Sequence, residues 1–291
     1  MSTEITPTKT HRDENFPVAS LLIAPRHRAT ILAFYRFVRA ADDVADSPAL
    51  PAAEKIARLD RLEAGLLGAA DAAPEALTLR RALAARNLSP RHAQDLLAAF
   101  RTDATKLRYR DWDDLIGYCT YSAMPVGRFV LDVHGENRRT WPASDALCAA
   151  LQIINHLQDC GRDYRALDRV YIPLDAIERN GVKIKDLGED RASPALENCV
   201  RDLAARTSDL LRAAAPFAMM IDDLRLALEV SVIHRLAETL VRRLMRRDPL
   251  SERVHLNAAE AGGVAALAIL AALPRRAARR AASPPRTIQD V

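Results

Sequence analysis

The stretch QIINHLQDCGRDYRALDRVYIP, residues 152–173, contains the pattern that decides the fold. Asn155, Asp159 and Asp163 stand at intervals of four, so a helix would place them in one stripe along a single face. The residues around that stripe are mostly apolar, Leu157 among them. An acidic stripe on an otherwise buried helix is costly unless something compensates it. These residues leave two kinds of compensation open, namely internal salt bridges and bound metal ions.

A second acidic run lies well before the first, in FYRFVRAADDVAD, residues 34–46. Asp42 and Asp46 are four apart and share one helix face, with Asp43 beside them. Three crowded carboxylates repel one another, so we expect a positive group nearby, and Arg39 shares the face of Asp42. Two oxygen-rich stripes suit Mg²⁺, which binds through a few carboxylates plus water and substrate phosphates. The two runs together therefore predict a site for Mg²⁺ and a diphosphate.

The whole chain has the pattern of helices, since alanine and leucine recur at three- and four-residue spacing without the alternation typical of strands. We predict an all-α fold, with one domain over residues 1–274 and a basic tail, residues 275–291, that we expect to be disordered. The longest stretch without a helical pattern, residues 167–190, is a candidate lid. The expected helices cover residues 26–46, 52–68, 76–86, 90–105, 111–134 with a break near Pro125, 144–166, 194–214, 222–246 and 256–272.

Charge and composition exclude several classes of protein. The chain has 42 Lys and Arg against 38 Asp and Glu, and the tail supplies the whole net charge of +4. The remaining body is neutral, which argues against a nucleic-acid partner, and no glycine-rich nucleotide fingerprint appears. The first residues lack the apolar run of a secretory signal, and four scattered cysteines fit buried thiols in a reducing compartment. We therefore expect a cytoplasmic protein.

The end of the chain allows two interpretations. An apolar run from Val264 to Leu273 is followed by Arg275, Arg276 and further arginines. Such a segment can lie on anionic lipid as an interfacial anchor, which would place the protein peripherally at the inner membrane through its basic tail. The alternative is a last core helix followed by a solvated tail.

The two motifs, with the Arg-x-x-Asp-Asp sequence that starts at Arg39, resemble the trans-isoprenyl diphosphate synthases that join prenyl chains head to head, the squalene and phytoene synthases. The resemblance runs from Glu14 to Glu260. It implies an isoprenoid synthase-type helical bundle with a central active-site cavity and a prenyl diphosphate substrate. It also implies catalytic and Mg²⁺-binding roles for Asp42, Asp46, Asn155, Asp159 and Asp163.

Finer features resemble one subgroup, the bacterial hydroxysqualene synthases of hopanoid pathways, in ENFPVAS (14–20), YSAMPVGRFVL (121–131) and QDCGRDYRALDRVYIP (158–173). Those enzymes take presqualene diphosphate, eliminate diphosphate and add water, so a presqualene diphosphate synthase would be a functional partner. Condensing relatives often carry Arg where this chain has Gln158, which fits an enzyme that starts from the condensed intermediate. The resemblance implies substrate-binding roles for Ser20, Tyr35, Arg39, Val126, Gly127, Gln158, Arg169 and Tyr171.

This chemistry requires an apolar cavity, because losing diphosphate creates a carbocation that must be shielded from most water. Gly127, inside an apolar helical run, marks a close approach or a kink. Tyr35 faces the cavity or the diphosphate, or instead satisfies a buried carbonyl. Water capture needs one polar group, for which Tyr121, Ser122, Asn155 and Gln158 are all candidates. The candidate wall residues, each of which could equally be ordinary core, are Phe34, Phe37, Val126, Phe129, Val130, Leu151 and Ile154.

Two other interpretations remain open at this stage. The first is a condensing synthase of the same fold, which would use farnesyl or geranylgeranyl diphosphate to make presqualene diphosphate, squalene or phytoene. The second is a helical scaffold without activity, against which the two intact acidic stripes argue. The arginines near the stripes, such as Arg162 and Arg165, either bind phosphate or form ordinary ion pairs.

Overall fold

The structure, a computed structural model, describes the backbone of residues 23–282 and the side chains of residues 23–274. Within these residues it contains helices and one isolated bridge between Arg108 and Val170, with no strand, so the predicted all-α class is confirmed. The longer helices are α1 (Pro25–Ala45), α2 (Ala52–Leu67), α3 (Pro74–Ala84), α4 (Arg91–Asp103), α5 (Trp112–Ser122), α6 (Met124–His134), α7 (Trp141–Leu167), α9 (Pro194–Ala214), α11 (Leu224–Leu244) and α12 (Ala258–Ala282). The short ones are η1 (Arg138–Thr140), α8 (Leu174–Arg179), η2 (Ile184–Gly188) and α10 (Phe217–Met220).

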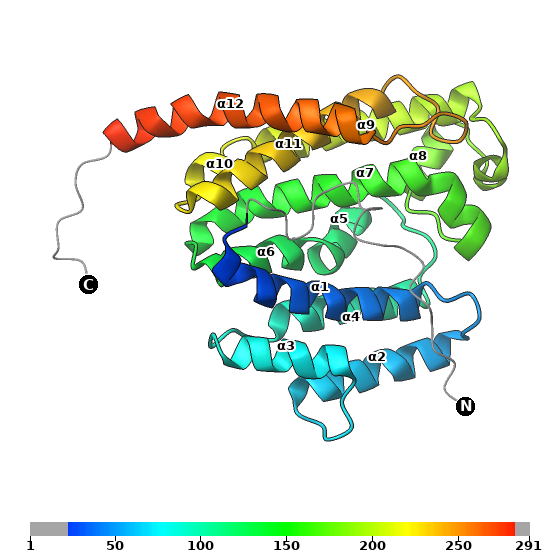
Figure 1. Ribbon diagram of the computed structural model, residues 1–291. Helices are drawn as coiled ribbons and strands as arrows, with labels where there is room; N and C mark the ends of the chain where they lie inside the picture. The colour runs from blue at the N-terminus through cyan, green and yellow to red at the C-terminus, as the bar shows by residue number, and fades with distance from the viewer. Residues whose placement is uncertain (1–22, 283–291) are drawn as a thin grey trace.

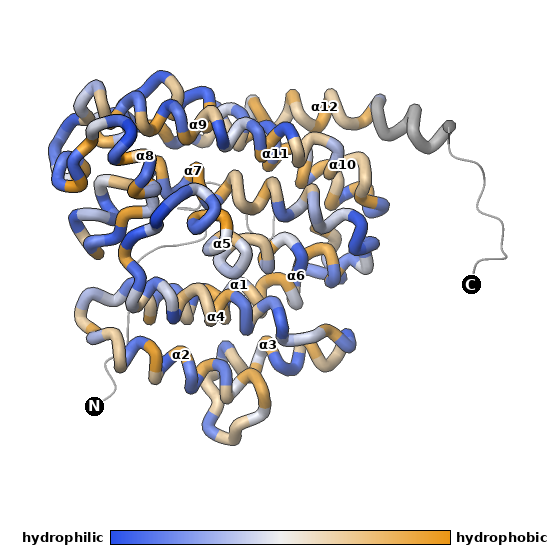
Figure 2. Tube along the Cα trace, turned by 180° about the vertical axis from the view of Figure 1, so that it is seen from behind, coloured by the Kyte–Doolittle hydropathy of each residue, from blue (hydrophilic) through white to orange (hydrophobic). Residues whose placement is uncertain are grey.

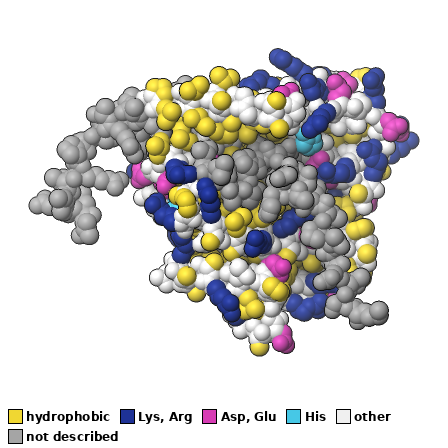
Figure 3. Space-filling model, in the orientation of Figure 1, with side chains coloured by type: hydrophobic (Ala, Val, Ile, Leu, Met, Phe, Trp, Pro, Cys, Tyr) yellow, Lys and Arg dark blue, Asp and Glu magenta, His cyan; other side chains and the backbone are white. Residues whose placement is uncertain are grey.

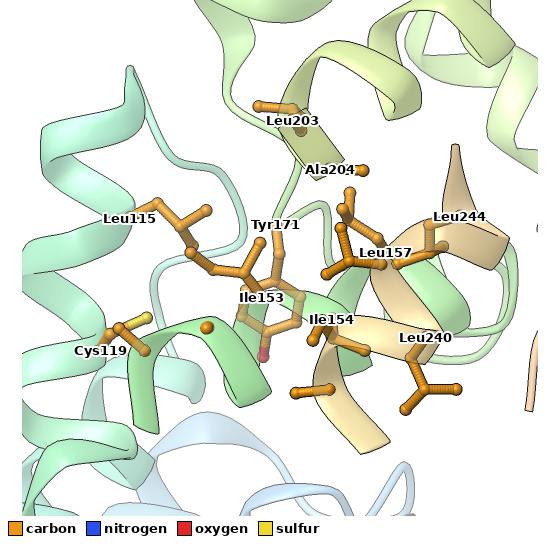
Figure 4. Close-up of a cluster of buried hydrophobic side chains, with 14 of the residues drawn as sticks. Leu115, Cys119, Ile153, Ile154, Leu157, Tyr171, Leu203, Ala204, Leu240 and Leu244 are labelled. Carbon is orange, nitrogen blue, oxygen red and sulfur yellow. The ribbon is translucent and has the colours of Figure 1, made fainter. Parts of the chain in front are cut away.

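The helices stack in layers, as Figure 1 shows, from α2 and α3 at one end to α9, α11 and α12 at the other. Helix α7 runs through the middle and packs against α5, α6, α9 and α11. Its residues Ile153, Ile154 and Leu157 are each no more than 2% exposed, and Figure 4 shows them between side chains of α5, α9 and α11. Burying each such side chain contributes about 1.5–3 kcal/mol, so the acidic stripe of α7 is held on a rigid support.

The break that we predicted near Pro125 separates α5 from α6. Ala123 takes a non-helical conformation, and Pro125 then lies in the first turn of α6, where its missing N–H would have no helical partner anyway. The same rule explains why α7 begins at Trp141, three residues before the predicted start, since Pro142 occupies its first turn. Helix α7 ends at Leu167 because Asp168 adopts a left-handed conformation with a φ of 50°.

The predicted lid, residues 167–190, is instead a packed segment. It contains α8 and η2, and its residues Tyr171, Ile172 and Leu187 are buried. The backbone N–H groups of Val170 and Leu174 donate to the carbonyls of Leu107 and Tyr109, each at 2.9 Å. These contacts anchor the segment to the chain before α5, so it forms part of the core around the site.

The last helix is longer than predicted. Helix α12 continues through Pro274 to Ala282, so helical backbone occupies the first residues of the segment that we expected to be a disordered tail. The alanine and arginine residues after Pro274 have high helix propensity, which offsets the cost of an internal proline. Residues 283–291 lie outside the described part, and the division at residue 274 stays a prediction. No helix between residues 23 and 282 combines the length and apolarity that crossing a bilayer requires.

Candidate active site

A cavity of about 850 Å³ lies among α1, α4, α5, α6, α7 and α11. Both predicted acidic stripes face it, together with a long apolar wall. Gln158 is buried in α7 but does not line the cavity, and Ser20 lies outside the described residues. The predicted site residues that line the cavity are Tyr35, Arg39, Asp42, Asp46, Val126, Gly127, Asn155, Asp159, Asp163, Arg169 and Tyr171.

The first acidic stripe sits at the C-terminal end of α1. Arg39 Nη1 lies 2.8 Å from Asp42 Oδ2, and Arg39 Nη2 lies 2.8 Å from Asp43 Oδ1. Arg39 is therefore the positive group that the crowded carboxylates required. Asp43 is not among the cavity-lining residues, so Asp42 and Asp46 are the members of this stripe that a ligand in the cavity can reach.

The second stripe lies on the last turns of α7. Arg162 Nη2 contacts Asp159 Oδ2 at 2.5 Å, while its Nε lies 3.8 Å from Asp163 Oδ1. Burial and, to a smaller extent, the neighbouring Asp159 charge raise the pKa of Asp163 to about 7, although the Arg162 charge acts in the opposite direction. Desolvation and the neighbouring negative charge therefore outweigh the two guanidinium groups, of Arg162 and Arg169, that act on Asp163.

These residues fit Mg²⁺ by their chemistry, because Asp42, Asp46, Asn155, Asp159 and Asp163 supply only oxygen ligands. The repulsion between Asp159 and Asp163, which contributes to the raised pKa of Asp163, is what a bound cation would relieve. Within residues 23–274, however, no three His, Cys, Asp or Glu side chains converge into a ready-made metal site. Arginine side chains now hold these carboxylates, so metal ions would have to bind with rearrangement of those pairs.

Arg169 connects the segment that follows the second stripe to the first stripe. Its side chain is 6% exposed, and its Nη1 contacts Asp46 Oδ1 at 2.5 Å while its Nη2 donates to the carbonyl of Ala45 at 2.9 Å. The segment after α7 is thereby tied to the end of α1. Arg169 therefore positions the Asp46 carboxylate, in addition to any contact that Arg169 makes with a substrate.

The apolar part of the cavity selects among the candidate wall residues. Phe34, Val126, Val130 and Leu151 line it, whereas Phe37, Phe129 and Ile154 are each no more than 1% exposed and belong to the core. For Gly127 we had expected either a close approach between helices or a kink. The structure shows a close approach of α6 to α7. A Cβ atom there would lie 2.4 Å from Ser144 Oγ and 2.6 Å from Cys148 Sγ.

Several polar residues of the cavity wall were not among the predicted site residues, Asp103, Tyr118 and His156 among them. Asp103 ends α4, Tyr118 lies on α5, and His156 stacks on Tyr171 with ring centroids 3.5 Å apart. Tyr121, which we had considered, is 45% exposed and does not line the cavity. Tyr118 could have been found, because it is four residues before the candidate Ser122 and shares its helix face. No pattern in the sequence around Asp103 indicates that this residue lines the cavity.

Comparisons with known proteins agree with this arrangement. The sequence profile described as squalene/phytoene synthase matches residues 9–260. The chain is 61% identical to the hydroxysqualene synthase of Rhodopseudomonas palustris over 89% of both chains. It is 55% identical to that of Sinorhizobium fredii, over 93% of this chain and 91% of the relative. Its fold matches the crystal structure of squalene synthase from Alicyclobacillus acidocaldarius with a TM-score of 0.71 and 32% identity, over 81% of this chain and 90% of that chain.

Proposed function

Because the chain belongs to the squalene/phytoene synthase family, we propose that it converts presqualene diphosphate and water to hydroxysqualene and diphosphate. The isoprenoid synthase-type helical fold expected from the sequence is confirmed by the solved relative. The high identity to two relatives named hydroxysqualene synthase, over nearly their whole length, is the observation that carries the proposed activity.

The two parts of the cavity support this reaction. Its acidic end carries Arg39 and Arg162, whose guanidinium groups match diphosphate oxygens. Mg²⁺, held by Asp42, Asp46, Asn155, Asp159 and Asp163, would neutralise the leaving diphosphate. The volume of about 850 Å³ is near the upper end of the range for ligand pockets, as a long prenyl chain requires.

The apolar wall serves the second half of the reaction. Phe34, Val126 and Leu151 offer no nucleophile, so a carbocation formed beside them would survive until water reaches it. Asp103, which Tyr118 and Tyr171 bind, feels the charges of Arg169 and Asp46, so these polar wall residues lie beside the acidic end, where the bond to diphosphate would break. Capture by water is therefore expected close to the leaving group and not along the apolar wall.

A condensing synthase is the second candidate, and the similarity to a protein named squalene synthase supports it. The test is product analysis by mass spectrometry after incubation with Mg²⁺ and no reductant. Hydroxysqualene formed from presqualene diphosphate, with farnesyl diphosphate left untouched, is the expected result. Conversion of farnesyl diphosphate to presqualene diphosphate would overturn the proposal. It would also mean that Gln158 does not distinguish this chain from the condensing synthases.

The reaction implies a source for its substrate. Presqualene diphosphate must come from an enzyme that condenses two farnesyl diphosphate molecules, so we propose a functional partnership with a presqualene diphosphate synthase. Both enzymes would work in the cytoplasm, beside the membrane that dissolves the thirty-carbon product.

Helix α12 supports a peripheral contact with that membrane. Leu267 and Leu270 are each 66% exposed and Leu273 is 44% exposed. Figure 2 shows the apolar character of this helix, and Figure 3 shows hydrophobic side chains along its outer edge. The sequence from residue 261 to residue 274 has no charged side chain, and four arginines follow in the same helix. An apolar face beside a basic segment is the combination that binds anionic lipid.

Sedimentation with vesicles tests this contact. The full chain should co-sediment with vesicles that contain anionic lipid, and a variant with all four arginines between residues 275 and 280 changed to Gln should bind them more weakly. Leu267→Ser with Leu270→Ser should also release the protein. Equal binding by all three proteins would exclude α12 as the docking element.

A further inference from the structure

Asp103 is a buried carboxylate in the cavity wall to which the reaction described above assigns no role. It is 5% exposed and occupies the last position of α4. Two tyrosine hydroxyls donate to it, Tyr118 Oη to Oδ2 at 2.8 Å and Tyr171 Oη to Oδ1 at 3.3 Å. A buried carboxylate needs such donors, so these contacts fix the direction of both hydroxyl protons.

That direction decides what the cavity can bind next to Tyr118. A tyrosine hydroxyl has one proton and otherwise acts only as an acceptor. Because the proton of Tyr118 points at Asp103, its oxygen can offer the cavity only lone pairs. A water molecule beside Tyr118 must therefore donate a proton to it, and the lone pairs of that water then point away from Tyr118, toward the space where a substrate carbon would lie.

The pair also lies beside the end of the cavity where a cation would form. The charge of Arg169, which binds Asp46 at 2.5 Å, also acts on Asp103. Tyr171, the second donor to Asp103, is two residues after Arg169 in the chain and lines the same cavity. Asp103 is thus linked through one arginine to the first acidic stripe.

We propose that Asp103 is a positioning residue that holds Tyr118 as the acceptor for the water molecule that captures the carbocation. This inference rests on the proposed function. The carbon–oxygen bond to diphosphate breaks and its electron pair leaves with the diphosphate. A lone pair of water forms the new carbon–oxygen bond, the released proton passes to Tyr118, and the hydroxyl proton of Tyr118 passes to Asp103, which later returns it to bulk water.

The electrostatics of Asp103 agree with this role. Burial raises its pKa to about 6, and it does so against the opposing effects of the Arg169 charge and the Tyr118 hydrogen bond. A carboxylate with a pKa near neutrality is ionised when it orients Tyr118 and is still basic enough to accept a proton.

Two variants and one control test the proposal. Asp103→Asn keeps the volume but removes the proton acceptor, and Tyr118→Phe removes the hydroxyl. Asp132→Asn is the control, because Asp132 pairs with His92 at 2.9 Å and neither residue lines the cavity. Each protein is incubated with presqualene diphosphate and Mg²⁺, and diphosphate release is measured separately from the organic products.

The share of hydroxysqualene among the products should fall roughly tenfold in Asp103→Asn, because an amide cannot take up the proton that water releases, and in Tyr118→Phe, because a phenyl ring cannot bind the water; olefins from proton loss should appear in its place. Diphosphate release should fall less than this share, and Asp132→Asn should keep the ratio of the parent protein. An unchanged ratio in a folded Tyr118→Phe variant that still releases diphosphate would overturn the inference. Absence of diphosphate release in the parent protein would instead overturn the proposed function.

Discussion

Replacing Gly127 by Ala tests the contact that forms one wall of the cavity. The added Cβ would lie 2.4 Å from Ser144 Oγ and 2.6 Å from Cys148 Sγ, which is closer than these atoms can approach. Ser144 is completely buried, so α6 and α7 must separate or both side chains must leave their rotamers. Overpacking of this kind costs about 1–3 kcal/mol. The melting temperature of the variant, followed by circular dichroism at 222 nm, should fall by roughly 2–4 °C per kcal/mol.

Gly117 supplies the matched control, because it lies inside α5 with no atom within 4 Å of an added Cβ. Gly117→Ala should raise stability by about 0.5–1 kcal/mol through helix propensity alone. Combining Gly127→Ala with Ser144→Ala and Cys148→Ala removes both clashing atoms and should restore most of the loss. If Gly127→Ala melted at the same temperature as Gly117→Ala, the close contact between α6 and α7 would be refuted.

Three further predictions concern charge. The pKa of His27 is lowered to about 4, first by burial and then by the neighbouring His134 and arginine charges, so the unfolded chain binds its proton more readily. Stability should therefore fall as the pH drops from about 6.5 to about 4, and His27→Gln should flatten that slope in pH-dependent urea unfolding. Arg169→Met should lower the free energy of unfolding by about 2–3 kcal/mol in the same assay. This is less than the loss expected for a fully buried ion pair, because the Asp46 side chain is half-exposed. An unchanged urea midpoint would mean that the pair between Arg169 and Asp46 does not stabilise the fold. Mg²⁺ with pyrophosphate should raise the melting temperature of the parent protein, and Asp159→Ala should fold but lose both this shift and turnover; an equal shift in both proteins would place the diphosphate elsewhere.

The acidic stripes could be predicted because their geometry is local. Residues four apart on a helix share a face whatever the rest of the fold does, so Asp42 with Asp46 and Asp159 with Asp163 reach one cavity as expected. Gln158 shows the limit of that argument, since one residue turns the helix by about 100° and takes it from the stripe of Asp159 into the core.

The remaining parts of the site depend on contacts that no short pattern encodes. Asp103 gains its role from Tyr118 and from Tyr171, which is 68 residues away in the chain. Residues 167–190 lack a helical period and suggested a lid, but their backbone hydrogen bonds to the residues before α5 hold them in place. In both cases long-range packing decided the outcome, and local propensity did not.

The contact of Arg169 with Asp46 has a consequence for how the protein matures. It joins residues 123 positions apart, so the chain must close a long loop before the two halves of the acidic end can meet. Helices α1 to α6 can form from nearby contacts while the ribosome is still adding residues, but the acidic end cannot be completed until α7 and the segment after it have emerged. We therefore expect a nascent chain to acquire secondary structure early and its affinity for diphosphate late. Metal and ligand binding would then wait until the helices around the cavity have assembled.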